Sequence, residues 1–316
     1  DSDRGNFVCH AYDGGKNGGT GVFVELRFLG TPGFVAFLLP ALLFLAFTSV
    51  YPLARTFWLS FHTWFMNKPN TSPQFVGLGE YQNTLADGVF RTSALNTAVF
   101  GVGTVAVEIV LGLALALALT SGGGGIKIAR SILLVPMIMT PVVVGVLWRI
   151  LYYDKGLVNY LLSLVGLGPV FWFVDPTWAF IGVMLVDIWQ WTPFVMIVLT
   201  AALASLPGEP FRAAQIDGAS RWQVFRYLTL PMLMPVLLVT ALLRFMDAIK
   251  VFDTIYVLTG GGPGYATEML SSYIYKQGLR YFNIGGAAAA SWMFLLVIVV
   301  ISIVMIRLRA KAGRAE

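Results

Sequence analysis

An all-α integral membrane protein is the fold class that this sequence predicts, and three observations support it. Of the 316 residues, 57% are hydrophobic and only 12% are charged, which is more apolar surface than a soluble core of this size can bury. Six separate segments are apolar over the length, about 20 residues, that crosses roughly 30 Å of hydrocarbon. Lysine and arginine fall at the ends of these segments rather than in one patch, so the net charge of +5 does not indicate nucleic-acid binding.

The amino-terminal lead, residues 1–32, is polar and glycine-rich and has no apolar run long enough for a signal peptide. We expect it to be a mobile cytoplasmic segment. The Gly-Lys-Ser/Thr ending of a phosphate-binding loop occurs nowhere in the chain, so ATP binding by that route is excluded. Cys9 is the only cysteine, and its neighbour His10 adds only a weak metal signal. No metal or cofactor site is therefore predicted in this chain.

The predicted spans form a transmembrane domain, residues 33–308, which a basic cytoplasmic tail, residues 309–316, follows. Pro40 and Pro52 fall inside the first span, where neighbouring helices can satisfy the carbonyls that proline leaves free. The six spans cover about residues 33–61, 94–119, 131–152, 177–204, 232–258 and 284–307.

The distribution of basic residues predicts the orientation of these spans. An even number of spans places both termini on one side of the membrane. That side carries nine Lys and Arg residues between and after the spans, namely Lys127, Arg130, Arg212, Arg221, Arg226, Arg307, Arg309, Lys311 and Arg314. The opposite side carries five, namely Lys68, Arg91, Lys155, Lys276 and Arg280. The bias places both termini and the loop between the fourth and fifth spans in the cytoplasm.

That loop, residues 205–231, is a polar island with helix signals of its own. Two prolines near its start suit the first turn of a short helix, where a missing N–H has no cost. Gly218 interrupts this helix, and Ser220 with Gln223 has the form of a capping box that begins another. We expect two short helices joined at the glycine.

The sequence of the island resembles a family motif. Its residues Arg212, Ala213, Ala214, Asp217, Gly218 and Ala219, closed by Leu230 and Pro231, resemble the EAA motif in permease subunits of binding-protein-dependent ABC importers. Arg212 stands where that family usually has glutamate. The resemblance implies that the loop docks into a cleft of the ATP-hydrolysing subunit, and the small alanines would let that surface approach closely. An amphipathic interfacial loop without a partner is the alternative interpretation.

Further stretches extend the resemblance over residues 33–307. They include Phe75–Leu78, Trp189–Phe194 and Phe252–Thr259, and their order is most similar to the carbohydrate-importing branch, the maltose and glycerol-3-phosphate type. The resemblance implies a type I ABC importer permease fold with cytoplasmic coupling helices, in the inner membrane of a prokaryote. It also implies a second permease subunit, a dimer of cytoplasmic ATPases that binds ATP and Mg, and an extracytoplasmic solute-binding protein.

The fifth span carries four charges of alternating sign at steps of three, Arg244, Asp247, Lys250 and Asp253. On a helix each charge would find its opposite one turn away. Four charges near the bilayer centre would cost roughly 10–14 kcal/mol, against roughly 4–8 kcal/mol returned by the apolar residues of this span. The charges must therefore face other helices or a watery path. A pathway lining and a helix-packing ladder both fit this pattern.

The fourth span places Asp187, Gln190 and Trp191 on one helix face, with Trp189 nearby. Hydrogen-bonding groups beside an aromatic ring suit a sugar, so we interpret this face as part of a translocation pathway. An interfacial tryptophan belt is the alternative. Glu108 in the second span is a lone acid, for which we expect a partner on a neighbouring helix rather than proton coupling.

The sequence thus predicts a permease subunit of an ATP-driven importer that moves a sugar or a related polar solute. A self-sufficient secondary transporter that uses the intramembrane acids as proton relays is the alternative. It would need inverted repeats, and residues 33–152 show no similarity to residues 177–307. No nucleophile, base or metal cluster in the sequence indicates an enzyme.

Overall fold

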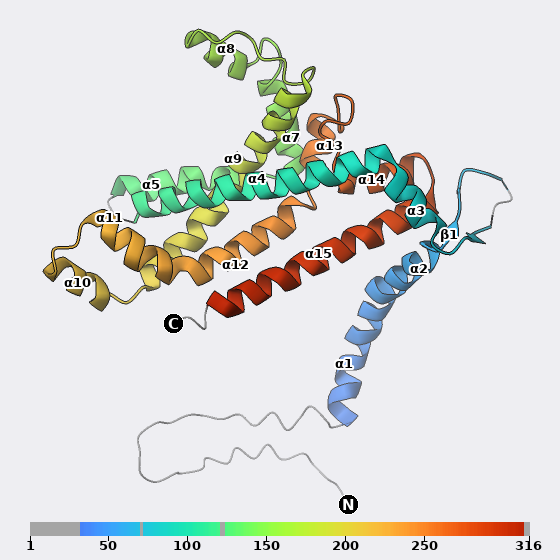
Figure 1. Ribbon diagram of the computed structural model, residues 1–316, viewed down its shortest axis with the longest axis horizontal. Helices are drawn as coiled ribbons and strands as arrows, with labels where there is room; N and C mark the ends of the chain where they lie inside the picture. Colours follow the sequence, from blue (N-terminus) through green and yellow to red (C-terminus); the bar gives the residue numbers. More distant parts are fainter. Residues whose placement is uncertain (1–31, 70–71, 121–123, 313–316) are drawn as a thin grey trace, which may run out of the picture. The chain divides into compact units, whose positions relative to one another are not determined.

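The residues that the computed structural model describes are 32–69, 72–120 and 124–312 (Figure 1). The predicted lead, except for Pro32, and residues 313–316 of the predicted tail lie outside the described residues. The chain forms two compact units, residues 1–53 and 54–316.

The described part of the first unit is helical. The helix α1 (Pro32–Leu45) continues through the π-helical turn η2 (Ala46–Val50) into α2 (Tyr51–Leu59). The stretch Leu38–Leu59 is long and apolar enough to cross a membrane, which confirms the first predicted span. Its large apolar side chains are exposed, as lipid-facing positions require.

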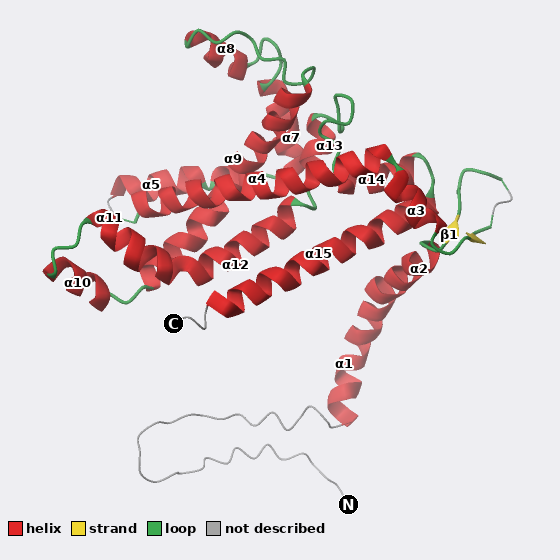
Figure 2. Ribbon diagram, in the orientation of Figure 1, coloured by secondary structure: helices red, strands yellow, loops and turns green. Residues whose placement is uncertain are grey.

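The second unit is helical in nearly all of its regular structure (Figure 2). A short antiparallel pair of strands, β1 (His62–Thr63) and β2 (Gln74–Phe75), stands near its start. The helices that follow are α3 (Gly79–Ala86), α4 (Gly88–Ala118), α5 (Gly124–Leu133), α6 (Val135–Ile138), α7 (Pro141–Leu151), α8 (Leu157–Leu164), α9 (Pro176–Ser205), α10 (Glu209–Ile216), α11 (Arg221–Val224), η3 (Phe225–Thr229), α12 (Leu230–Ala248), α13 (Asp253–Leu258), α14 (Leu270–Tyr275), η4 (Lys276–Arg280) and α15 (Ile284–Ala312).

Within the described residues, five helical runs are long and apolar enough to span a membrane, and a bent helix pair brings the number to six. The second, fourth and sixth predicted spans are confirmed as α4, α9 and α15. The number of crossings therefore agrees with the sequence, whereas the third and fifth spans differ from the predicted segments.

The third predicted span, residues 131–152, is not one continuous helix. Residues 128–138 and 141–151 are helical, but the two parts are bent by 100°. Thr140 has an extended backbone with ψ of 143°, because the ring of Pro141 disfavours a helical conformation in the residue before it. Proline also lacks the N–H that would continue the helical hydrogen bonds. The third predicted span is therefore present as a bent helix pair.

The fifth predicted span, residues 232–258, is displaced and interrupted. Its helical run begins already at Arg221, passes through η3, and ends at Ala248. The backbone then leaves the helix before α13 starts at Asp253. Non-helical backbone at membrane depth is tolerated where it lines a cavity, and this break does so.

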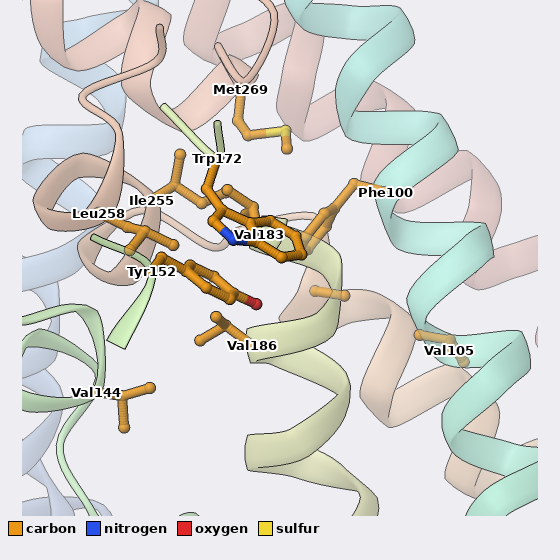
Figure 3. Packing of buried hydrophobic residues seen from close by; sticks show 11 residues of the cluster. Phe100, Val105, Val144, Tyr152, Trp172, Val183, Val186, Ile255, Leu258 and Met269 are labelled. Carbon is orange, nitrogen blue, oxygen red and sulfur yellow. The ribbon is translucent and has the colours of Figure 1, made fainter. Parts of the chain in front are cut away.

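Two of the three apolar clusters among the described residues join α4, α9 and α12. The larger one surrounds the stacked rings of Tyr152 and Trp172, whose centroids are 4.4 Å apart, and gathers residues of α4, α7, α9 and α13 (Figure 3). The second cluster joins the other ends of α4, α9 and α12, with Leu199 and Leu233 fully buried. These clusters hold α4, α9 and α12 against one another. The charged side chains of these helices are thereby kept in defined positions.

α4 and α9 pack closely against each other at Gly112. A Cβ atom added at this glycine would lie 2.5 Å from Cγ1 of Val195 and 3.1 Å from the backbone nitrogen of Met196. Small residues let membrane helices pack closely, and dispersion contacts then replace the hydrophobic driving force that lipid cannot supply. Gly112 is therefore a packing position that tolerates no side chain.

We expect Gly112→Leu to push α4 away from α9 and to lower the stability of the folded subunit by about 1–3 kcal/mol, the usual cost of overpacking. Thermal unfolding of the purified protein in detergent measures the change. Gly88→Ala is a matched control on the same helix, because a Cβ at Gly88 meets no atom within 4 Å. Equal stability of the two variants would contradict the close packing at Gly112.

Candidate functional site

A buried ion cluster joins three of the long helices. Arg244 on α12 donates from Nε and Nη2 to the two carboxylate oxygens of Glu108 on α4, at 2.8 and 2.9 Å. Its Nη2 also donates to Oδ2 of Asp187 on α9, at 3.0 Å. Arg244 is 2% exposed and Glu108 is fully buried. The expected partner of Glu108 on a neighbouring helix is thereby confirmed.

The geometry of this cluster satisfies the charges that it buries. Bidentate contact between a guanidinium and a carboxylate is stronger and more directional than a neutral hydrogen bond. Buried ions persist only when such contacts offset their loss of hydration. The guanidinium of Arg244 also lies over the ring of Trp191, with Cζ 4.9 Å from the ring centroid. The cluster therefore fixes the rotation of α4, α9 and α12 about their axes.

A pocket of about 280 Å³ opens beside the cluster. It lies where α12 ends and α13 begins, and Pro141 at the start of α7 forms part of its wall. Six of the side chains predicted to line a pathway do line this pocket, namely Asp187, Trp191, Arg244, Asp247, Lys250 and Asp253. The structure thus brings together residues of the fourth and fifth predicted spans at one cavity.

The charge ladder of the fifth span holds for only part of its length. Nη1 of Arg244 lies 4.0 Å from Asp247, and Nζ of Lys250 lies 3.5 Å from the same carboxylate. The side chains of Asp247 and Lys250 are 58% and 52% exposed. Asp253 begins a different helix, so the last step of the predicted ladder does not lie on a common helix face.

Two predicted pathway residues lie away from this pocket. Trp189 packs on the apolar cluster, with its ring centroid 5.3 Å from that of Trp148. Gln190 is buried, and its Nε2 donates to the carbonyl of Met139 at 3.2 Å. That hydrogen bond connects α9 to the bend between α6 and α7. Their predicted part in a pathway therefore has no support from the pocket geometry.

The pocket also contains residues that the sequence analysis did not select. Phe252 lines it beside Asp253, and its ring extends into an aromatic group with Tyr256 and Tyr275, at centroid distances of 5.1 and 4.9 Å. Phe252 lies two residues after Lys250. A continuous helix would not predict that Phe252 shares a pocket with Asp187. Only the break after Ala248 places it at the pocket.

Two chain breaks meet at the same pocket. The bend at Thr140 and the break between α12 and α13 are joined by a hydrogen bond from Oγ1 of Thr254 to the carbonyl of Pro141, at 3.3 Å. α7 and α13 pack on each other and belong to one apolar cluster. α7 and α13 thus form a pair, and the non-helical residues that precede each of them lie beside the pocket.

Polar contacts tie the elements beyond α13. Nζ of Lys276 donates to the carboxylate of Glu268 and, at 2.9 Å, to the carbonyl of Gly260. The hydroxyl of Tyr273 donates to Oδ2 of Asp87, the capping residue of α4, at 2.7 Å. Burial, together with this carboxylate, raises the pKa of Tyr273, so the phenol remains a donor. The Tyr273 contact holds α14 to the start of α4, and the Lys276 contacts hold η4 to the loop between α13 and α14.

The island between α9 and α12 folds as the two short helices that the sequence predicts, α10 and α11 (Figure 1). Gly218 has a φ of +71°, and the N–H groups of Gly218 and Ala219 donate to the carbonyls of Gln215 and Ala214. This arrangement is a Schellman motif, which needs a left-handed residue. Ser220 and Gln223 form the predicted capping box.

The surface of this helical hairpin combines a groove with exposed apolar side chains. The groove has a volume of about 400 Å³ and includes Ala214, Asp217, Gly218 and Ala219 of the predicted motif. Ile216 is 87% exposed and Trp222 is 68% exposed. Arg212 and Ala213 are exposed on α10. All six motif residues thus lie on one hairpin that presents a hollow and apolar side chains, the features of a protein-binding surface.

Comparisons with known proteins identify relatives of this chain. The family model described as "Binding-protein-dependent transport system inner membrane component" matches residues 109–313. A probable ABC transporter permease protein, y4oQ of Sinorhizobium fredii, is 38% identical over 86% of this chain and 88% of its own length. The trehalose/maltose transport system permease protein MalF of Thermococcus litoralis is also 38% identical, over 78% of this chain and 82% of its own.

A solved structure shows the same fold. A chain in the crystal structure of a bacterial ABC transporter involved in the import of the acidic polysaccharide alginate aligns with a TM-score of 0.76 and 25% identity. The alignment covers 87% of this chain and 94% of that one.

Arg244→Gln removes the only cation that contacts Glu108 and Asp187 among the described residues. We expect a loss of about 3–5 kcal/mol in stability, because two buried carboxylates lose their counter-charge. Lys250→Gln is the matched control, since its exposed pair with Asp247 contributes only about 0–1 kcal/mol. Thermal unfolding in detergent compares the variants. A Lys250 variant as unstable as the Arg244 variant would contradict the central place of the buried cluster.

Proposed function

The chain belongs to the family of binding-protein-dependent transport system inner membrane components, and we propose that it moves a sugar or a related polar solute into the cell as a permease subunit of an ABC importer. We assign the pathway to the pocket beside Arg244 and the contact with the ATPase to the hairpin of α10 and α11.

One observation supports this assignment above the others: the hairpin directly connects the two helices that carry the walls of the pocket. α9 carries Asp187 and Trp191 and ends at Ser205, where the hairpin begins. The hairpin leads through η3 without a helical break into α12, which carries Arg244. At 1.5 Å per residue, Asp187 lies about 27 Å along α9 from the hairpin. Displacement of the hairpin therefore acts on both pocket walls at once.

The proposed assembly supplies what this chain lacks in sequence. The chain contains no Gly-Lys-Ser/Thr loop of its own. In the proposed assembly, a dimer of cytoplasmic ATPases therefore binds the ATP and Mg. A second permease subunit completes the path, and an extracytoplasmic binding protein delivers the solute. Arg212, in place of the glutamate usual in the family, gives the hairpin a positive charge for an acidic residue of the ATPase.

The orientation follows from the basic residues. We place the hairpin of residues 205–231, and both ends of the transmembrane domain of residues 33–308, on the cytoplasmic side of the inner membrane. The lead, residues 1–32, and the tail, residues 309–316, then lie on the cytoplasmic side as well. The loop around Gly262 and the helix α8 face outward.

A carbohydrate is the solute that the pocket fits best. Trp191 and Phe252 offer aromatic faces, while carboxylates and Lys250 offer acceptors and donors for hydroxyl groups. The names of relatives point in the same direction, since one is a trehalose/maltose transport system permease.

The geometry also gives a route for alternating access. Closure of the ATPase dimer would shift the hairpin and with it α9 and α12. α7 and α13 pack on each other, and each is joined to the neighbouring helix by non-helical backbone, at Thr140 and after Ala248. The angle between these neighbouring helices can therefore change without the loss of helical hydrogen bonds. A secondary transporter is less consistent with the structure, because both oxygens of Glu108 accept from Arg244 and the carboxylate is fully buried.

A topology experiment tests the orientation. An accessibility label at a cysteine introduced at Gly218 should react only from the cytoplasmic side, and one at Gly262 only from outside. Cys9→Ser removes the one natural cysteine beforehand. A label at Gly262 that reacts from the cytoplasm would refute the six-span arrangement.

Gly218→Val tests the hairpin as the coupling element. A β-branched residue adopts a positive φ only with strain, so the Schellman turn and the angle between α10 and α11 should change, whereas the spans remain intact. We expect normal membrane levels but loss of bound ATPase, or of hydrolysis stimulated by the loaded binding protein, measured in reconstituted vesicles. Gly208→Ala is the control, because Gly208 has an ordinary φ of −76°. Wild-type coupling in Gly218→Val would refute the assignment.

A further inference from the structure

We propose that the pocket beside Arg244 selects uncharged saccharides and rejects acidic ones, with Asp253 as a residue that determines this specificity. The inference rests on the proposed transport of a carbohydrate and specifies its charge. Three observations support it: the excess of negative charge at the pocket, the contacts that its two cations already make, and the position of Asp253.

Negative charge outweighs positive charge at this pocket. Asp187, Asp247 and Asp253 line it together with Arg244 and Lys250, and Glu108 lies directly behind Arg244. Four carboxyl groups therefore face two cations. An anionic solute meets net repulsion, which a low-dielectric wall strengthens.

Both cations at the pocket already contact carboxylates of the chain, and Arg244 is fully engaged. An arginine binds a carboxylate best through two parallel N–H groups. In Arg244, Nε and Nη2 donate to Glu108 and Asp187, and Nη1 lies 4.0 Å from Asp247. The ring of Trp191 covers one face of the guanidinium. Nζ of Lys250 lies 3.5 Å from Asp247, so the charge of this exposed ammonium is partly balanced while it can still donate to a hydroxyl. An acidic solute would compete with Asp247 for Lys250 and with Glu108 and Asp187 for Arg244.

Asp253 is the carboxylate that remains for the solute. It makes no ion pair among the described residues, it is exposed at the first turn of α13, and it lies next to Phe252. Ionised carboxylates only accept hydrogen bonds, so sugar hydroxyls suit Asp253 and a second carboxylate does not. The aromatic rings of Phe252 and Trp191 are placed to cover the apolar face of a sugar ring.

This pocket would therefore oppose an acidic substrate, although the solved relative that shares its fold belongs to an importer of the acidic polysaccharide alginate.

Equilibrium binding to the assembled complex in nanodiscs, without binding protein, tests the inference. The probes are maltose and the same disaccharide with glucuronic acid in place of one glucose. We expect the wild-type complex to bind maltose more tightly, and the preference to shrink as ionic strength rises, because salt screens repulsion but not steric fit. Binding of the acidic probe as tight as that of maltose would overturn this inference alone. Binding of neither would overturn the proposed carbohydrate substrate and this inference with it.

The variant Asp253→Asn removes one negative charge without breaking an ion pair. We expect it to shift the ratio of the two affinities toward the acidic probe by about tenfold, which corresponds to about 1.4 kcal/mol. Asp154→Asn is the matched control, since Asp154 is exposed and does not line the pocket. An unchanged ratio in Asp253→Asn, or an equal shift in Asp154→Asn, would contradict the role of Asp253.

Discussion

The guanidinium of Arg244 is bonded to Glu108 and Asp187, and this buried contact determines how α4, α9 and α12 face one another. Each partner comes from a different helix, so none of the three can rotate without leaving a buried charge unpaired. The apolar clusters that join these helices add an attraction that is non-directional. The hydrogen bonds of the ion cluster, by contrast, have fixed directions. The pocket owes its shape to that restriction.

Local spacing predicted the contacts that lie on one helix and missed those that depend on tertiary structure. Arg244 and Asp247 are neighbours because α12 is helical at that point, whereas Asp253 leaves the expected face because the helix has already ended. A partner on a neighbouring helix could be expected for Glu108, since a lone buried acid is costly. Its identity could not, since Arg244 is 136 positions away in sequence and no periodicity connects the two.

The helix breaks at Thr140 and after Ala248 differ in how clearly the sequence indicates them. Pro136 and Pro141 are local signals, and the bend at Thr140 follows from the restriction that proline places on its predecessor. No proline or glycine stands between Ala248 and Asp253, so the sequence there gives no signal for a helix end. There the backbone departs from the helix because it borders a polar cavity and packs α13 on α7. The hairpin, by contrast, could be predicted in detail, because glycine and capping residues act within a few positions.

The exposed side chains of Ile216 and Trp222 also bear on how the subunit is maintained in the cell. Water-exposed apolar area is unfavourable by about 25 cal/mol per Å², and burial against a partner recovers that free energy. In the proposed assembly, a subunit made in excess of its ATPase would keep this surface open to the cytosol, where chaperones and proteases recognise such patches. The proposed contact then implies that assembly protects the chain and that its abundance follows the supply of its partner.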